Sequence, residues 1–411
     1  MDFELFTLSN GIKVAHRRID SPVAYCCLMV NAGTRDESEQ EHGLAHFIEH
    51  MMFKGTAKRR AHHILTRLDN VGGELNAYTT KEETVVHSTC LREDYARAVE
   101  LIADIVFCSA FPEREIRKEQ DVVVDEINSY RDSPSELIYD DFETMVYAGH
   151  PLAHNILGVE ESVRSFGREH LQRFVAEHYC TDQMVWCSVA DVPTWRVRRL
   201  MEQHLGTIPA NRSQLKRPPV GLYTPSRRQR DMATHQAHCL MGAPAYNLHS
   251  DRRHALFLLN NILGGPGMNS RLNIALRERH GFAYNVESAY QPYSDTGLFT
   301  ISFGTDPKLY QRAYSVVHAE IDKLQQHPLT PVQLSRAKRQ LIGQLAIASE
   351  SNEALMLSAA KGFLVYDEPE DAKLINERIE AITAADLQAV AQEVLNRDAL
   401  SYITYVSDTA R

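Results

Sequence analysis

Alternating apolar and polar positions near the start of the chain are typical of β-strands. The stretch 3–32 shows this alternation, and the dipeptide Asn10-Gly11 interrupts it between two apolar runs. An Asn-Gly pair in this position is typical of a tight β-hairpin. The pattern therefore predicts antiparallel strands over this stretch. Further strands are expected at 74–79 and, returning, at 84–90.

A period of three to four residues predicts helices between and after these strands. Apolar residues recur at the spacing of one buried helical face at Leu44, Phe47, Ile48, Met51 and Met52. Ser38 and Glu41 form a capping-box pattern before this helix, and Gly55 is a stop signal after it. The same period predicts further helices at 61–71, at 94–107 and after Pro112.

The chain also repeats itself. The pattern of residues 111–127 recurs at 329–345, an offset of 218 (345 − 127), and that of 166–172 recurs at 382–388, an offset of 216 (388 − 172). Near-constant offsets over two separate elements indicate an internal duplication. We therefore predict an α+β fold of two duplicated domains, each a largely antiparallel or mixed β-sheet covered by helices on one face.

A stretch rich in proline and arginine separates the two halves. It predicts domains at 1–214 and 231–411, joined by a linker at 215–230. The chain length of 411 residues fits two domains better than one.

Composition narrows the possible partners. The net charge of −10 makes nucleic acid a poor partner, whereas a basic or neutral peptide would not be repelled. The seven cysteines include no C-x-x-C pair, as expected of reduced thiols in a reducing compartment. Neither a membrane span nor a targeting segment is recognisable, so we expect a cytoplasmic protein without membrane contact.

The helix expected around Phe47 carries the candidate chemistry, in the pattern H-x-x-E-H. His46 and His50 lie one turn apart on one helical face, so both imidazoles could reach one metal ion. Glu49 lies beside them, where it could act on a water without ligating the metal. The alternative is a solvated helical face with an i, i+4 histidine pair.

A third ligand is expected in the helix after Pro112. Glu119 and Glu126 lie two turns apart at the border of its apolar stripe, where each could pair with an arginine or serve a metal. Glu126 would complete the His, His, Glu set of catalytic zinc, and Glu119 would orient a ligand. In the second copy these positions are Gln344 and Ala337, and residues 255–264 contain no histidine pair. This asymmetry favours a metal site in the first copy alone.

Taken together, the motif, the glutamate 76 positions after His50 and the two similar halves resemble the M16 family of zinc metallopeptidases, the pitrilysin/insulysin type. The length is similar to that of its short subunits, such as mitochondrial processing peptidase and its bacterial relatives. The resemblance implies that His46, His50 and Glu126 bind one Zn²⁺ per chain. It further implies that Glu49 is the general base and that Glu119 is an accessory glutamate.

The resemblance also implies substrate-binding residues. Asn76 and Ala77 match the family's active-site edge strand, to which a peptide would add as an extra strand. Arg277 and Tyr284 resemble the pair that clamps the bound peptide, with Arg277 holding a carbonyl and Tyr284 donating to the oxyanion. The glycine-rich stretch 264–272 is similar to a family segment, although by itself it would indicate a loop that ends a helix.

The expected function is that of a zinc-dependent endopeptidase acting on peptides or unfolded segments. In this family four such domains enclose a chamber, so the resemblance implies that a two-domain chain pairs, here as a homodimer. Two alternatives stay open. One is a catalytically silent scaffold or assembly subunit of the same fold, and the other is a zinc hydrolase that acts on non-peptide amides.

Overall fold

The computed structural model describes residues 3–214, 216–232, 234–369 and 371–407. These residues form two compact units, each made of three chain segments. The first unit contains the residues up to Asn128, His154–Arg217 and Ile347–Ala372. The second unit contains Ser129–Ala153, Pro218–Ala346 and the described residues from Lys373 onward.

This division differs from two contiguous domains joined by a linker at 215–230. Segment 129–153 belongs to the second unit and segment 347–372 to the first. Part of the expected linker is a strand, β7 (Arg227–Asp231). Each exchanged segment contains a helix that covers an apolar sheet face of its unit, and burial of that face does not depend on chain continuity.

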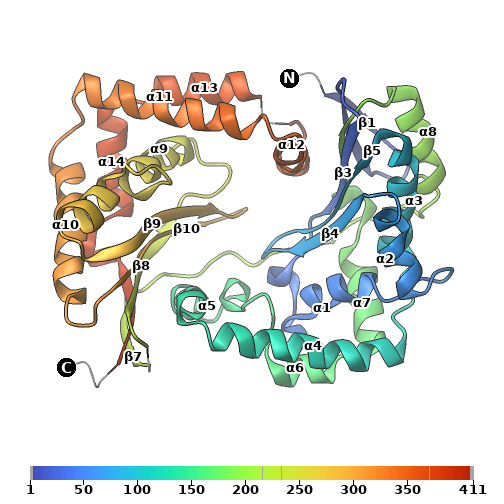
Figure 1. Ribbon diagram of the computed structural model, residues 1–411, viewed down its shortest axis with the longest axis horizontal. Helices are drawn as coiled ribbons and strands as arrows, with labels where there is room; N and C mark the ends of the chain where they lie inside the picture. Colours follow the sequence, from blue (N-terminus) through green and yellow to red (C-terminus); the bar gives the residue numbers. More distant parts are fainter. Residues whose placement is uncertain (1–2, 215, 233, 370, 408–411) are drawn as a thin grey trace. The chain divides into compact units, whose positions relative to one another are not determined.

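A six-stranded mixed sheet forms the centre of the first unit, in the order β1-β2-β6-β3-β5-β4 (Figure 1). Its strands are β1 (Glu4–Thr7), β2 (Lys13–Arg18), β3 (Val23–Val30), β4 (Glu74–Thr79), β5 (Thr84–Leu91) and β6 (Met184–Ala190). Only β2 and β6 run parallel; the other neighbours are antiparallel. The predicted early strands and the β4–β5 hairpin are confirmed, and β4 is an edge strand.

Most helices of the first unit share a core with one face of this sheet, around Leu28 and Trp186. They are α1 (Leu44–Met52), α2 (Ala61–Asp69), α3 (Tyr95–Phe107), α4 (Glu113–Arg131), α6 (Glu160–Ser165), α7 (Arg168–His178) and α8 (Thr194–His204). Because strand side chains alternate, Cys27 and Met29 face the opposite side. There they pack against α12 (Asn352–Tyr366), whose Met356 is fully buried.

The second unit repeats this plan with a five-stranded sheet, in the order β7-β11-β8-β10-β9. The remaining strands are β8 (Ala237–Ala245), β9 (Ala283–Pro292), β10 (Gly297–Thr305) and β11 (Ser401–Val406). Its helices include α9 (Arg253–Gly264), α10 (Tyr310–Gln326), α11 (Pro331–Ala348), α13 (Ala372–Ala381) and α14 (Ala384–Val394). Residues of α9, α10 and α14 share a core with one sheet face, and α5 (Pro134–Val146) packs on the other around Leu240 and Tyr405.

The predicted α+β class of two duplicated domains is confirmed. Helix α4 aligns with α11 and helix α7 with α14, as the repeat predicts. Covering of one sheet face only was expected, and this detail is wrong, because α12 and α5 each cover a second face. Alternation within a strand shows that both faces are apolar but not which helix covers them.

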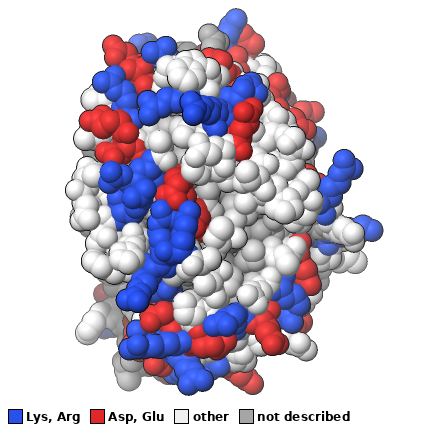
Figure 2. Space-filling view, turned by 90° about the vertical axis from the view of Figure 1, so that its right-hand side faces the viewer, with Lys and Arg blue, Asp and Glu red and all other residues white. Residues whose placement is uncertain are grey.

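One side of the first unit is densely charged. Figure 2 shows basic side chains gathered next to acidic ones on this side, where α2, α3 and α8 lie in Figure 1. Glu100 of α3 bonds Lys58 and Arg59, and Arg59 also bonds Asp104. Among the described residues, no helix is both long and apolar enough to cross a membrane.

Candidate metal centre

The helix that carries the histidine pair, α1, starts at a tightly constrained point. Gly43 precedes it with φ +91°, and a Cβ there would lie 2.6 Å from the carbonyl oxygen of Leu157. The Glu37 carboxylate accepts hydrogen bonds from the backbone N–H groups of Gly43 (2.9 Å) and Ala45 (2.8 Å). A buried acceptor therefore satisfies N–H groups that α1 itself cannot pair.

The predicted capping box is present but caps another element. Ser38 and Glu41 hydrogen-bond each other around a short 3₁₀ turn, Glu39–Glu41, which ends before α1 begins. The prediction that this pair caps α1 is therefore wrong. The chain turns between the two elements, and Glu37 provides the oxygens instead.

His46, His50 and Glu126 converge on one point. Nε2 of His46 lies 3.9 Å and Nε2 of His50 3.7 Å from Oε2 of Glu126. One ligand atom from each residue lies within 4.8 Å of the others, and no other group of this kind occurs among the described residues. Tetrahedral zinc with bonds of about 2.0–2.2 Å holds its ligand atoms about 3.3–3.6 Å apart. The three residues therefore fit such an ion with small side-chain movements.

The neutral state of His46 also favours its binding of a metal. Burial, aided by the charge of His50, lowers the pKa of His46 to about 3, so its imidazole is neutral and offers a lone pair. Burial alone would lower the pKa of His50, but the hydrogen bond and charge of Glu119 outweigh it and raise that pKa. The negative charge of Glu119 thus stabilises a positive charge on His50. It would stabilise a cation bound to this histidine in the same way.

Glu119 lies behind His50 and does not contribute a ligand atom. Its Oε1 lies 2.9 Å from Nδ1 of His50, and its Oε2 lies 2.6 Å from Nζ of Lys54. Burial raises the pKa of Glu119, but its bonds to His50 and Lys54 outweigh burial and lower the pKa. An ionised Glu119 accepts the Nδ1–H of His50 and leaves Nε2 free for a metal.

Glu49 lies on α1 between the two histidines, outside the group of ligand atoms. Its Oε2 accepts a 2.6 Å hydrogen bond from the hydroxyl of Thr79, the last residue of β4. Burial raises the pKa of Glu49, and the bond from Thr79 opposes this rise. A carboxylate that is held but not ligated is suited to take a proton from a water.

The predicted substrate strand lies at an open sheet edge. Within the described part of the chain β4 pairs with β5 alone, and Asn76 and Ala77 lie in its middle. Asn76 is exposed and Ala77 half-buried. An unpaired edge offers backbone donors and acceptors to an added strand.

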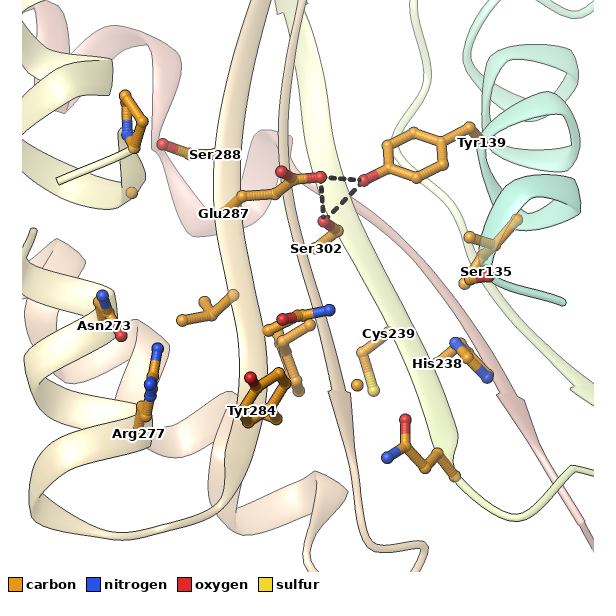
Figure 3. Close-up of a pocket in the computed structure, with 18 of the residues that line it drawn as sticks. Ser135, Tyr139, His238, Cys239, Asn273, Arg277, Tyr284, Glu287, Ser288 and Ser302 are labelled. Atoms are coloured by element: carbon orange, nitrogen blue, oxygen red, sulfur yellow. Dashed lines mark hydrogen bonds between the residues drawn. The ribbon is translucent and has the colours of Figure 1, made fainter. Parts of the chain in front are cut away.

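The two clamp residues lie together in the second unit. Arg277 belongs to a π-helical segment, Asn273–Arg279, and its guanidinium carbon lies 5.1 Å from the ring centroid of Tyr284 at the start of β9. Both line a hollow of about 870 Å³. Figure 3 shows the hollow, with a hydrogen-bonded group of Tyr139, Glu287 and Ser302 on its other side.

The glycine-rich stretch also borders this hollow. α9 ends at Gly264, and a Cβ on that residue would lie 2.5 Å from the backbone nitrogen of Ser288 in β9. The interpretation as a helix-ending loop therefore fits the structure, and glycine is required there because helix and strand approach so closely.

Sequence reasoning did not identify three contacts of the centre. Lys54 pairs with Glu119, Glu37 binds the start of α1, and Thr79, named only as part of the edge strand, binds Glu49. The spacing of residues along the sequence does not predict these partners, because each contact joins separate segments or depends on a turn.

Comparisons with known proteins find relatives along nearly the whole chain. Residues 13–160 match the family "Insulinase (Peptidase family M16)", and residues 165–341 match "Peptidase M16 inactive domain". An uncharacterized zinc protease of Rickettsia bellii is 32% identical over 98% of this chain and 97% of its own. The uncharacterized zinc protease YmxG of Bacillus subtilis is 30% identical over 96% of both chains.

Two solved structures share the fold over nearly the whole chain. A peptidase M16 inactive domain from Pseudomonas fluorescens has a TM-score of 0.92 at 20% identity, covering 99% of this chain and 98% of its own. A protease from Helicobacter pylori has a TM-score of 0.89 at 21% identity, covering 98% and 99%.

Proposed function

Because this chain belongs to peptidase family M16, we propose that it is a zinc-dependent endopeptidase that cleaves peptides or unfolded polypeptide segments. The observation that carries the proposal is the convergence of His46, His50 and Glu126 within 4.8 Å, with Glu49 beside them. The zinc protease names of the relatives support the choice of metal.

His46, His50 and Glu126 would hold one Zn²⁺. When bound, the ion acidifies a water and polarises the carbonyl of the scissile peptide bond. Glu49 takes a proton from the attacking water and later delivers it to the leaving amine. Glu119 keeps Nδ1 of His50 protonated, so that Nε2 stays available as a ligand.

Substrate would bind in extended form along β4, where Asn76 and Ala77 offer backbone groups at the open edge. From the family resemblance, Arg277 would hold a substrate carbonyl and Tyr284 would donate to the developing oxyanion. Their mutual packing at 5.1 Å supports a joint role, because each restrains the other.

The competing function is a silent scaffold of the same fold. One solved relative and the family matched by residues 165–341 are both called an inactive domain. That part of the chain carries Ala337 in α11, at the position that the repeat aligns with Glu119, and Gln344 follows in the same helix. The retained histidines and glutamates of the first unit favour an enzyme, because a scaffold does not need them.

A digest of mixed peptides, read by mass spectrometry, tests the proposal. The zinc-loaded protein should cleave, a chelator should stop cleavage, and added zinc should restore it. Glu49→Gln should retain one zinc per chain by metal analysis while losing cleavage by several orders of magnitude.

Full activity in Glu49→Gln would refute the assignment of the base. A zinc-free, inactive wild type would favour the scaffold. Zinc binding without peptide cleavage, but with hydrolysis of small amides, would favour the other hydrolase.

We also propose that the working enzyme is a homodimer. The basis is the two-domain length, which the family resemblance links to pairing of chains. Size-exclusion chromatography with activity measured across the peak tests it. A catalytically active monomer would contradict it.

A further inference from the structure

One contact of the candidate metal centre has no role in the proposed function. It joins the edge strand β4 to Glu49, the proposed general base. The Thr79 hydroxyl donates to Oε2 of Glu49 at 2.6 Å. A bond this short is typical of a hydroxyl that donates to a charged carboxylate. Thr79 is only 8% exposed, so its hydroxyl has little access to water.

This bond leaves Glu49 with one fixed and one available oxygen. Oε2 accepts the Thr79 hydroxyl, whereas no other side chain among the described residues donates to this carboxylate. A free glutamate side chain samples many rotamers, and ordering it costs conformational entropy. Thr79 offsets part of this cost before a substrate arrives and leaves Oε1 to meet the water.

Thr79 is itself held firmly. It pairs with Thr84 at the closed end of the β4–β5 hairpin. The turn that follows is anchored by a buried ion pair between Arg35 and Glu82 at 2.7 Å and by a second pair between Lys361 and Glu83 at 2.9 Å. The sheet and these two ion pairs therefore fix the position of the Thr79 hydroxyl.

We propose that Thr79 is a positioning residue that orients Glu49 and thereby links the base to the strand on which the peptide would dock. This inference rests on the proposed peptidase function. Asn76 and Ala77 lie three and two residues earlier on the same strand. A peptide that pairs with β4 would reduce the motion of this edge strand. Through the hydrogen bond from Thr79, it would also reduce the motion of the Glu49 side chain.

Two substitutions separate the hydroxyl from the rest of the side chain. Thr79→Val keeps the shape and removes the donor, whereas Thr79→Ser keeps the donor. We expect Thr79→Val to lower kcat about 10- to 100-fold, with KM changed less than about twofold, because a misplaced catalytic group can cost about 100-fold. Thr79→Ser should retain kcat within about threefold of wild type.

A matched control is available on the neighbouring strand. Thr89 of β5 is half-buried and makes no hydrogen bond through its side chain to a described residue. Thr89→Val should keep wild-type kcat and KM. Zinc affinity by competition with a fluorescent chelator, and the melting temperature, should be equal in all variants.

A readout without turnover completes the test. A crystal structure of the metal-free wild type should show Glu49 in one orientation, and that of metal-free Thr79→Val should show more than one. Binding of a peptide to the metal-free protein, followed by fluorescence anisotropy, should be the same in both.

Wild-type kcat in Thr79→Val would overturn the proposal, and so would an equal loss in Thr79→Ser. Loss of zinc or a lower melting temperature in Thr79→Val would also overturn it, because the role would then be structural. If the wild type cleaves no peptide, the proposed function fails. The orientation of Glu49 in the two metal-free structures then still decides whether Thr79 orients it.

Discussion

Oε1 of Glu119 lies 2.9 Å from Nδ1 of His50, so this carboxylate fixes the orientation of the imidazole that we propose as a metal ligand. Partners of this kind commonly change metal affinity 10- to 100-fold when they are removed. The contact is therefore expected to matter for the metal as much as for the fold.

Replacing Glu119 should weaken zinc binding without abolishing it. In Glu119→Gln we expect the Kd for zinc to rise about 10- to 100-fold, because the charge that favours a cation at His50 is lost. Competition with a fluorescent zinc chelator measures this. Glu115→Gln, on the same helix and paired with Lys118 near the surface, is the control and should keep wild-type affinity. Equal affinity in Glu119→Gln would contradict the role.

Glu37 should stabilise the start of α1, the helix that carries His46 and His50. Glu37→Ala removes the acceptors of the Gly43 and Ala45 N–H groups. Each unsatisfied buried donor costs about 1–3 kcal/mol, so we expect the free energy of unfolding to fall by at least about 1 kcal/mol. Urea titration followed by circular dichroism measures it. The exposed Glu39→Ala should change stability little, and a similar loss there would argue against a specific cap.

Acid should remove the contribution of Glu100 to stability. Burial raises the pKa of Glu100, but the hydrogen bonds and charges of Lys58 and Arg59 outweigh this and lower the pKa to about 2. The folded pKa is thus below the unfolded value of about 4.3, so the stabilisation is complete above that value and is lost between about pH 4.3 and 2.

The variant Glu100→Gln tests this contribution directly. It should melt at a lower temperature than wild type at pH 6, and the difference should shrink as the pH falls toward 2. Calorimetry across this range measures it. A constant difference at all pH values would show that packing, and not charge, accounts for the loss.

Tyr284 should act through its hydroxyl. Tyr284→Phe keeps the ring that packs under Arg277 and removes only the donor. If the hydroxyl donates to the oxyanion, kcat should fall about 100- to 1,000-fold with little change in KM. Tyr310→Phe, a half-buried tyrosine of the same unit, is the control and should retain wild-type kinetics. A change confined to KM would assign Tyr284 to substrate binding alone.

Much of the fold could be predicted from sequence because its signals are local. Alternation predicted the early strands and the β4–β5 hairpin, and the helical period predicted α1 through Phe47 and Met51. The repeat predicted the duplication, because two copies keep the same order of apolar positions. The helices α5 and α12 on the second sheet faces were missed, since an apolar face does not specify its partner.

The sequence by itself determined that His46, Glu49 and His50 share one helical face, because residues three and four apart always do. It also predicted Glu126 as the third ligand, and the structure places this carboxylate near both imidazoles. Only the tertiary structure decided that Glu37 binds the start of α1, that Lys54 and His50 share Glu119, and that Thr79 holds Glu49. The physical reason is the distance along the sequence between the interacting residues. Helical spacing follows from the local backbone alone, whereas a hydrogen bond between distant segments depends on how the whole chain packs.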